Sequence, residues 1–343
     1  MSSKSQNPPP LEPIESPQPS REHRLVEIRR EAESRGRVEA LGVRLPGAPL
    51  PLPSSELSYY DLPLLKEPQW SWEIPPYFFV GGAAGSAAVI GAIARWTGRD
   101  PELARDCRYV SAVGTALSAT LLISDLGRPA RFLAMMRVFK PQSPMSVGAW
   151  TLAIFGTASA AAAFAELLNQ RFNSLPVRIL GHLSEAVSAV AGLPFSNYTG
   201  VLIGATAIPV WNENIETLPI HFGMSGLNSA VSILELMGHE NPALNTLGMG
   251  ASAIETIEGY HIESTQKPAL EPLKRGSSGL ITRVGGVLSG PVPLALRIAA
   301  AFAGTRRARK IRQTAAISSL VGSMLTRIAW VQAGHVSARQ SRP

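Results

Sequence analysis

The sequence contains a single cysteine, Cys107, in 343 residues. One cysteine excludes an intramolecular disulfide framework and an iron–sulfur cluster held by the chain's own cysteines. Any electron-transfer metal would have to belong to another subunit or be ligated by other residues. Residues 1–20 also lack an apolar stretch and carry many prolines, so we expect no secretory signal peptide there.

Charge is missing from four long stretches. Asp, Glu, Lys and Arg are absent from residues 74–94, 141–165, 186–212 and 217–234. A helix needs about 20 mostly apolar residues to cross a bilayer, so each stretch predicts a membrane span. In the third stretch, we expect Pro194 to kink the helix or to mark a re-entry point.

Four further segments are shorter or run into charged residues; they cover residues 109–124, 241–254, 284–304 and 313–338. Strand-like alternation and hairpin turn signals do not compete with a helical interpretation. We therefore predict an all-α membrane protein with eight transmembrane helices. Their expected bounds are about 74–97, 107–125, 146–167, 185–211, 217–237, 242–261, 281–304 and 313–335.

These helices make up a predicted transmembrane domain at residues 70–338. Residues 1–69 predict a Pro-rich tail, a surface-lying helix at 21–41 and a linker. The net charge of +7 suits basic loops beside membrane lipids, and we expect no nucleic-acid partner. The basic run at 306–312 favours an inside position for that loop and outside positions for both termini, although the basic loop at 126–140 competes with this orientation.

The first candidate site lies where the first predicted span begins. Trp72, Glu73 and Tyr77 stand in the run Trp-Ser-Trp-Glu-Ile-Pro-Pro-Tyr-Phe-Phe. A carboxylate among aromatic rings at a membrane interface suits the head group of a lipid-soluble quinone. An aromatic belt at the interface, with Glu73 facing lipid head groups, is the other interpretation.

Two more motifs lie in later spans, one at the end of the second span and one inside the fourth. Asp125 and Arg128 stand in Asp-Leu-Gly-Arg-Pro, and they form either a simple ion pair or part of a proton or quinone site. Tyr198 stands in Asn-Tyr-Thr-Gly inside the fourth span. A tyrosine at that depth either satisfies its hydroxyl within the bundle or lines a ligand pocket.

Ionisable groups within or beside the spans are candidates for a proton pathway: Glu185, His221, Glu255 and Glu258. Some of these side chains could instead reach solvent at helix ends. The six histidines show no pairing at useful spacing on one helix, so we expect no haem and no metal ligated by this chain.

Together these motifs resemble the NrfD/PsrC family of integral membrane, quinol-interacting subunits of polysulfide, nitrite and related respiratory complexes. The resemblance is carried by residues 72–82, 125–132, 137–150, 197–211 and 218–226. Its most specific part is Asp-Leu-Gly-Arg-Pro, followed by Arg-Phe and then by Met-Ser-Val-Gly-Ala-Trp. The long N-terminal tail and His221, which stands where an aliphatic residue would be expected, depart from the family pattern.

The resemblance implies two four-helix halves and a multi-pass protein of the bacterial inner membrane. It also implies that the subunit binds menaquinone or ubiquinone and exchanges electrons with an iron–sulfur, ferredoxin-like partner. A molybdopterin subunit often completes such a complex. The implied quinone-binding residues are Trp72, Glu73, Tyr77, Asp125, Arg128 and Tyr198. Two other functions stay open: a proton-conducting or transporter-like bundle, and a structural membrane anchor.

Overall fold

The structure is a computed structural model, and the residues it describes are Val26, Glu27, Arg30, Leu65, 67–98, 100–126 and 130–340. Most of the predicted tail, surface helix and linker lies outside the described residues, as does Arg128. The chain divides into two units, and the account below concerns the compact unit Leu65–Ser341.

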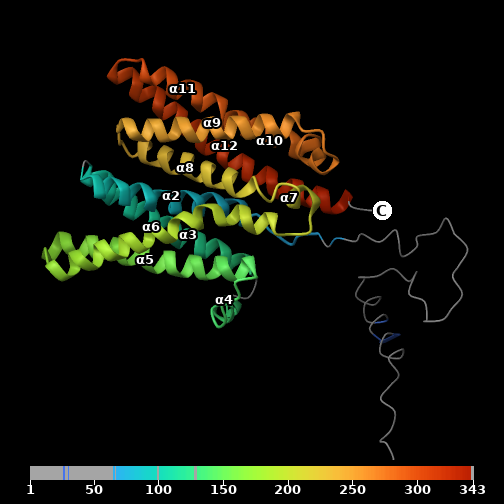
Figure 1. Cartoon of the computed structure of the whole chain (residues 1–343), viewed down its shortest axis with the longest axis horizontal. Helices are drawn as coiled ribbons and strands as arrows, with labels where there is room; N and C mark the ends of the chain where they lie inside the picture. Colours follow the sequence, from blue (N-terminus) through green and yellow to red (C-terminus); the bar gives the residue numbers. More distant parts are fainter. Residues whose placement is uncertain are drawn as a thin grey trace, which may run out of the picture. The chain divides into compact units, whose positions relative to one another are not determined.

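The described part of this unit is built from helices and contains no strand. The longer helices run side by side, nearly parallel or antiparallel (Figure 1). Their bounds are α2 Ile74–Thr97, α3 Pro101–Asp125, α5 Pro144–Phe172, α6 Leu175–Gly204, α8 Leu218–Leu236, α9 Pro242–Ser264, α10 Gly276–Ser289, α11 Pro291–Ala301 and α12 Thr305–Gln340. Short helices connect them: α4 Ala130–Met135, α7 Pro209–Asn212 and the 3-10 helix η2 Pro268–Leu273.

Many of these helices begin with a proline in the first turn, directly after a polar residue. Asp100 accepts a hydrogen bond from the Leu103 amide at 3.0 Å at the start of α3, and Asn241 accepts one from the Ala243 amide at 2.9 Å at the start of α9. A proline there loses no hydrogen bond, since the first amides of a helix have no partner inside it. α2 ends at Gly98, whose φ of 63° is left-handed.

Six helical stretches of the described residues are long and apolar enough to cross a membrane: α2, α3, α5, α6, the α10–α11 pair and α12. The protein is therefore all-helical with multiple membrane spans, as predicted. α8 and α9 occupy the positions of the fifth and sixth predicted spans but are not among the six. In α8 the polar residues His221, Asn228 and Glu235 lower the mean hydropathy, and all three are buried against neighbouring helices.

Two predicted boundaries need correction. The fourth helix was expected to end at residue 211, with Pro194 as a kink or a re-entry point; α6 continues through Pro194, so the chain does not re-enter there, and it ends at Gly204. The seventh was expected as one helix over 281–304, but it breaks at Gly290 into α10 and α11. A side chain at Gly290 would come within 2.9 Å of the Gly286 carbonyl, so the break requires glycine.

The packing forms two sets of neighbours. α2 packs on α3 and α6, and α5 also packs on α3 and α6. α12 packs on α8, α10 and α11, while α9 packs on α8, α10 and α11. α8 joins the sets, because it also contacts α2 and α6. Gly82 of α2 and Gly226 of α8 meet there, and a side chain at Gly226 would lie 2.9 Å from the Gly82 carbonyl.

Candidate functional site

The segment that leads into α2 is fixed to the end of α12 and to α7. Glu67 accepts a hydrogen bond from Arg339 Nε at 2.8 Å and lies 3.4 Å from His335 Nδ1. The hydrogen bond from Arg339 lowers the pKa of Glu67 below its ordinary value. Trp70 stacks on Trp211, with ring centroids 4.9 Å apart. The residues just before α2 are thus held over one end of the bundle.

Ser71 brings together two predicted site residues from different helices. Its hydroxyl contacts the carboxylates of both Glu73, which precedes α2, and Asp125, which ends α3. The Ser71 amide also donates to Asp125 at 3.3 Å. A hydroxyl carries one hydrogen, so it can donate to only one of the two carboxylates.

Two buried tyrosines lie at this same end of the bundle. Tyr77 is one helical turn after Glu73, and only 2% of its surface is exposed. Tyr198 of α6 is 7% exposed, and its ring fills the space left by Gly148 in the second turn of α5. The two tyrosines are close enough to interact electrostatically. Within the part of the chain described here, neither hydroxyl has a hydrogen-bond partner, so both are available to a ligand.

Trp72 does not join these residues in the structure. Trp72 is 73% exposed, whereas Trp70 packs into the bundle against Trp211 and Phe78. Arg128 lies outside the described residues. Trp70 and Ser71 were not predicted as site residues, although both belong to the aromatic motif that identified Glu73 and Tyr77.

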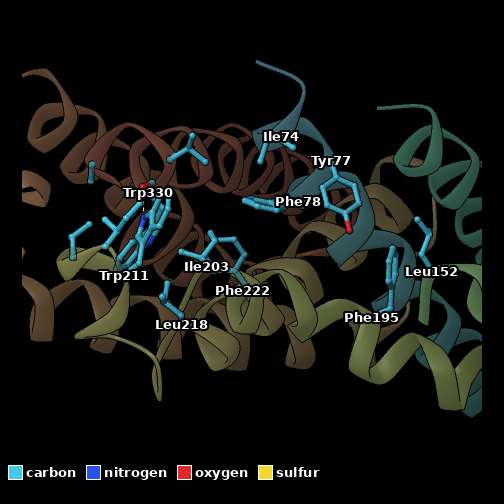
Figure 2. Close-up of a cluster of buried hydrophobic side chains, with 14 of the residues drawn as sticks. Ile74, Tyr77, Phe78, Leu152, Phe195, Ile203, Trp211, Leu218, Phe222 and Trp330 are labelled. Carbon is cyan, nitrogen blue, oxygen red and sulfur yellow. Dashed lines mark hydrogen bonds between the residues drawn. The ribbon is translucent and has the colours of Figure 1, made fainter. Parts of the chain in front are cut away.

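An aromatic and aliphatic cluster includes Tyr77 and continues from it toward Trp211 and Trp330 (Figure 2). Phe78 of α2 meets Phe222 of α8 edge to face, with centroids 5.7 Å apart. Trp211 donates a hydrogen bond through Nε1 to the Trp330 carbonyl of α12 at 2.8 Å. The cluster therefore connects α2, α7, α8 and α12.

Three of the four predicted proton-pathway residues lie together on α8 and α9. His221 Nδ1 is 2.8 Å from Glu258 Oε2, and Asn228 Nδ2 donates to Glu255 Oε2 at 2.8 Å. Glu255 is 2% exposed and interacts electrostatically with His221 and with Arg327 of α12. These groups form a continuous polar region inside the second set of helices.

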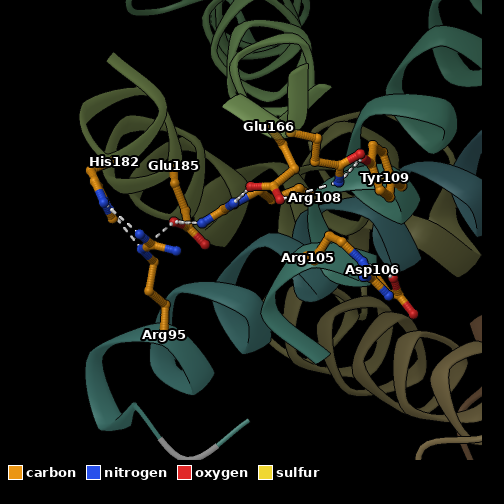
Figure 3. Close-up of polar contacts among 9 residues, drawn as sticks. Arg95, Arg105, Asp106, Arg108, Tyr109, Glu166, His182 and Glu185 are labelled. Atoms are coloured by element: carbon orange, nitrogen blue, oxygen red, sulfur yellow. Dashed lines mark hydrogen bonds and ion pairs between the residues drawn. The ribbon is translucent and has the colours of Figure 1, made fainter. Parts of the chain in front are cut away.

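The fourth predicted residue, Glu185 of α6, belongs to a separate cluster in the first set of helices (Figure 3). Arg108 of α3 is 2.7 Å from Glu185 and also contacts Glu166 of α5. Arg95, in the last turn of α2, lies 3.4 Å from Glu185 and contacts His182. Because it sits where α2 and α5 end and α3 and α6 begin, this cluster lies toward the opposite end of the bundle from Ser71.

The polar groups around Ser71 suit hydrogen bonding and proton exchange rather than metal binding. Over the described parts of residues 65–340, no group of three or more His, Cys, Asp or Glu side chains could hold a metal ion. Glu73 and Asp125 offer oxygen acceptors, while Tyr77 and Tyr198 offer hydroxyls that both donate and accept.

Comparison with known proteins supplies the family. The model described as "Polysulphide reductase, NrfD" matches residues 65–240, just over half of the chain. This chain belongs to the NrfD family. The matched segment runs from before α2 to after α8, so it contains Ser71, both carboxylates and both tyrosines. A search of the curated proteins returned no match.

Proposed function

We propose that this NrfD family protein binds a quinone or quinol beside Ser71, as the membrane subunit of a respiratory oxidoreductase complex. The single observation that carries the proposal is the meeting of Glu73 and Asp125 at Ser71, at the end of the bundle that also holds two tyrosines with free hydroxyls. Menaquinone and ubiquinone both have the two ring oxygens that such an arrangement would bind.

The chain's own residues would handle protons at this site. Oxidation of a quinol releases two protons and two electrons. Glu73 and Asp125 would each accept a proton, because a carboxylate within hydrogen-bond reach of a quinol hydroxyl acts as a general base. Tyr77 and Tyr198 would orient the ring through its oxygens. Trp72 and Arg128 stay predicted members of the site.

The electrons would pass to or from a partner. With one buried cysteine, the chain does not supply the four thiolates that an iron–sulfur cluster needs, so we propose a ferredoxin-like iron–sulfur subunit as the partner. A molybdopterin subunit would complete the complex. We place the protein in the bacterial inner membrane, with α8 and α9 as two further spans, which makes eight helices in two halves of four.

Proton movement would use the buried polar groups away from the quinone. His221, Glu258 and Glu255 lie close enough to form a relay on α8 and α9. Glu185 is surrounded by arginines in the other set of helices, so it would serve a second route rather than the same one.

The test is quinol-linked turnover by the assembled complex in native membranes. We expect Asp125→Asn and Tyr198→Phe each to lower turnover by about tenfold or more while the complex still assembles, since each removes a group that bonds or deprotonates the quinol. Tyr109→Phe is the matched control, because the Tyr109 hydroxyl accepts only from Gln170 at 3.3 Å, at the other end of α3.

Two other outcomes would assign a different function. A proton or solute flux in purified protein that lacks quinone-dependent activity would favour a transporter-like bundle. Unchanged turnover in both variants, with loss of activity only when partner contacts are altered, would favour a structural anchor.

A further inference from the structure

A cavity of about 410 Å³ lies among α9, α10 and α12. Apart from His221, the residues that line it follow residue 240, so they lie beyond the segment that matches the family. Its volume falls within the range of about 300–1,000 Å³ that is typical of small-molecule sites. The proposed quinone site at Ser71 does not share any of its lining residues.

The inner wall of the cavity carries buried polar groups with unused bonding capacity. Glu255 is 2% exposed and His221 is 8% exposed. Glu255 Oε1 and His221 Nε2 are both buried and have no hydrogen-bond partner in the described chain. Leaving a buried polar atom unpaired costs free energy, which a ligand hydroxyl would recover by donating a hydrogen bond to it. Trp330, 3% exposed, adds an aromatic surface beside them.

The outer rim favours a neutral ligand. Tyr260 and Val287 are exposed there and make the rim largely apolar. Arg283 is the one lysine or arginine among the described lining residues, and it is already held by both oxygens of Glu263, at 2.6 and 3.3 Å. An anionic head group would therefore meet Glu255 and Glu263 without a free cation to balance it.

Two glycines keep the cavity open. Gly259 of α9 and Gly286 of α10 line it, and a side-chain carbon built on either meets nothing within 4 Å. Larger residues there would project into the empty space. The opening between α9 and α10 thus depends on the absence of two side chains.

We propose that this cavity is a second binding site for a neutral, lipid-soluble ring molecule with carbonyl or hydroxyl oxygens, of the quinone class. A hydroxyl of its reduced, quinol form would donate to Glu255 Oε1, a second ring oxygen would bond His221 Nε2, the ring would lie against Trp330, and the tail would leave between α9 and α10. The choice of the quinone class rests on the proposed function, but the site does not require that Ser71 bind quinone.

The test is photolabelling of the whole complex in membranes with an arylazide derivative of decylubiquinone, followed by mapping of the labelled peptides. We expect label on peptides that contain residues 255–263 and 282–291. Gly259→Leu and Gly286→Leu should each reduce this label by about tenfold or more, because leucine fills the space of the ligand. Gly250→Leu is the matched control on α9, since Gly250 also has nothing within 4 Å but lies outside the cavity.

Competition experiments distinguish a quinone from a membrane phospholipid as the ligand of the cavity. Excess decylubiquinone should displace the label, and excess dioleoylphosphatidylglycerol should not. Displacement by the phospholipid alone would overturn the proposal, as would label that persists in Gly259→Leu and Gly286→Leu or falls equally in Gly250→Leu. Label on α2 and α6 peptides reports on the Ser71 site separately, so failure of either site is visible by itself.

Discussion

Gly148 determines where the Tyr198 ring can lie. A side-chain carbon at position 148 would sit 1.8 Å from Tyr198 Cζ and 2.1 Å from its hydroxyl oxygen. We predict that Gly148→Ala displaces the ring and lowers quinol-linked turnover by about 10- to 100-fold, the effect expected when a positioning group moves by about an ångström. The measurement is turnover per assembled complex, with the amount of complex determined in parallel.

Gly156→Ala is the matched control on the same helix, because a carbon there meets only the Thr115 methyl group, at 3.0 Å. Equal losses in the two variants would mean that α5 is disturbed generally. Full turnover in Gly148→Ala would show that Tyr198 does not contribute to the reaction.

At the residue scale, the chemistry of the side chains identified candidate site residues, but the sequence did not show which way those side chains point. The sequence identified Glu73, Asp125 and Tyr198 as candidates, and the structure brings the two carboxylates together at Ser71. The sequence could not show whether Trp70 or Trp72 packs into the bundle. The segment before α2 is irregular, so no helical or strand period indicates which of the two rings packs into the bundle.

At the scale of elements, a fully buried ion pair joins α8 to α11. Arg297 Nη1 is 2.8 Å from Glu235 Oε1, and the side chains are 0% and 3% exposed. Gly248 of α9 leaves room for the guanidinium, since a side-chain carbon there would lie 2.4 Å from Arg297 Cζ. The pair therefore ties three helices together within the predicted span at 281–304.

We predict that Arg297→Met destabilises the protein by about 3–5 kcal/mol, because it leaves the Glu235 charge buried without a partner. Thermal unfolding of purified protein in detergent measures the loss. The double variant Arg297→Met/Glu235→Leu should recover most of it, since neither charge then remains. A double variant as unstable as the single one would contradict this account.

The end of a helix was predictable where charged residues or glycine follow an apolar run, and it was not predictable elsewhere. α2 was predicted at its observed bounds, because charges and a glycine follow its apolar run. The end of α6 at Gly204 was not predicted. Residues 205–211 are uncharged, and hydropathy does not distinguish an apolar turn from an apolar helix. The break at Gly290 depends on contact with Thr256 of α9, which a single segment cannot reveal.

Across the whole molecule, one end of the bundle carries both proposed ligand sites. Aromatic rings form a chain between them: Tyr77–Phe78, Phe78–Phe222, Phe222–His221 and His221–Trp330 have centroid separations of 5.5, 5.7, 5.8 and 6.1 Å. The sequence indicated a helical protein with multiple spans but not this arrangement of rings, because the arrangement arises from contacts between helices far apart in the chain.

The contact between Gly82 and Gly226 is where α2 meets α8. A side-chain carbon at position 226 would lie 2.9 Å from both the carbonyl carbon and oxygen of Gly82, and backbone cannot move aside as a side chain can. We predict that Gly226→Val separates the two sets of helices locally and lowers the thermal unfolding midpoint, because overpacking costs about 1–3 kcal/mol.

Gly250→Val is the control, since a side chain at position 250 enters open space. Limited proteolysis of the connection at residues 205–217 should accelerate in Gly226→Val alone. An unchanged midpoint with unchanged cleavage would mean that the two sets are held together elsewhere, through α12 and α2.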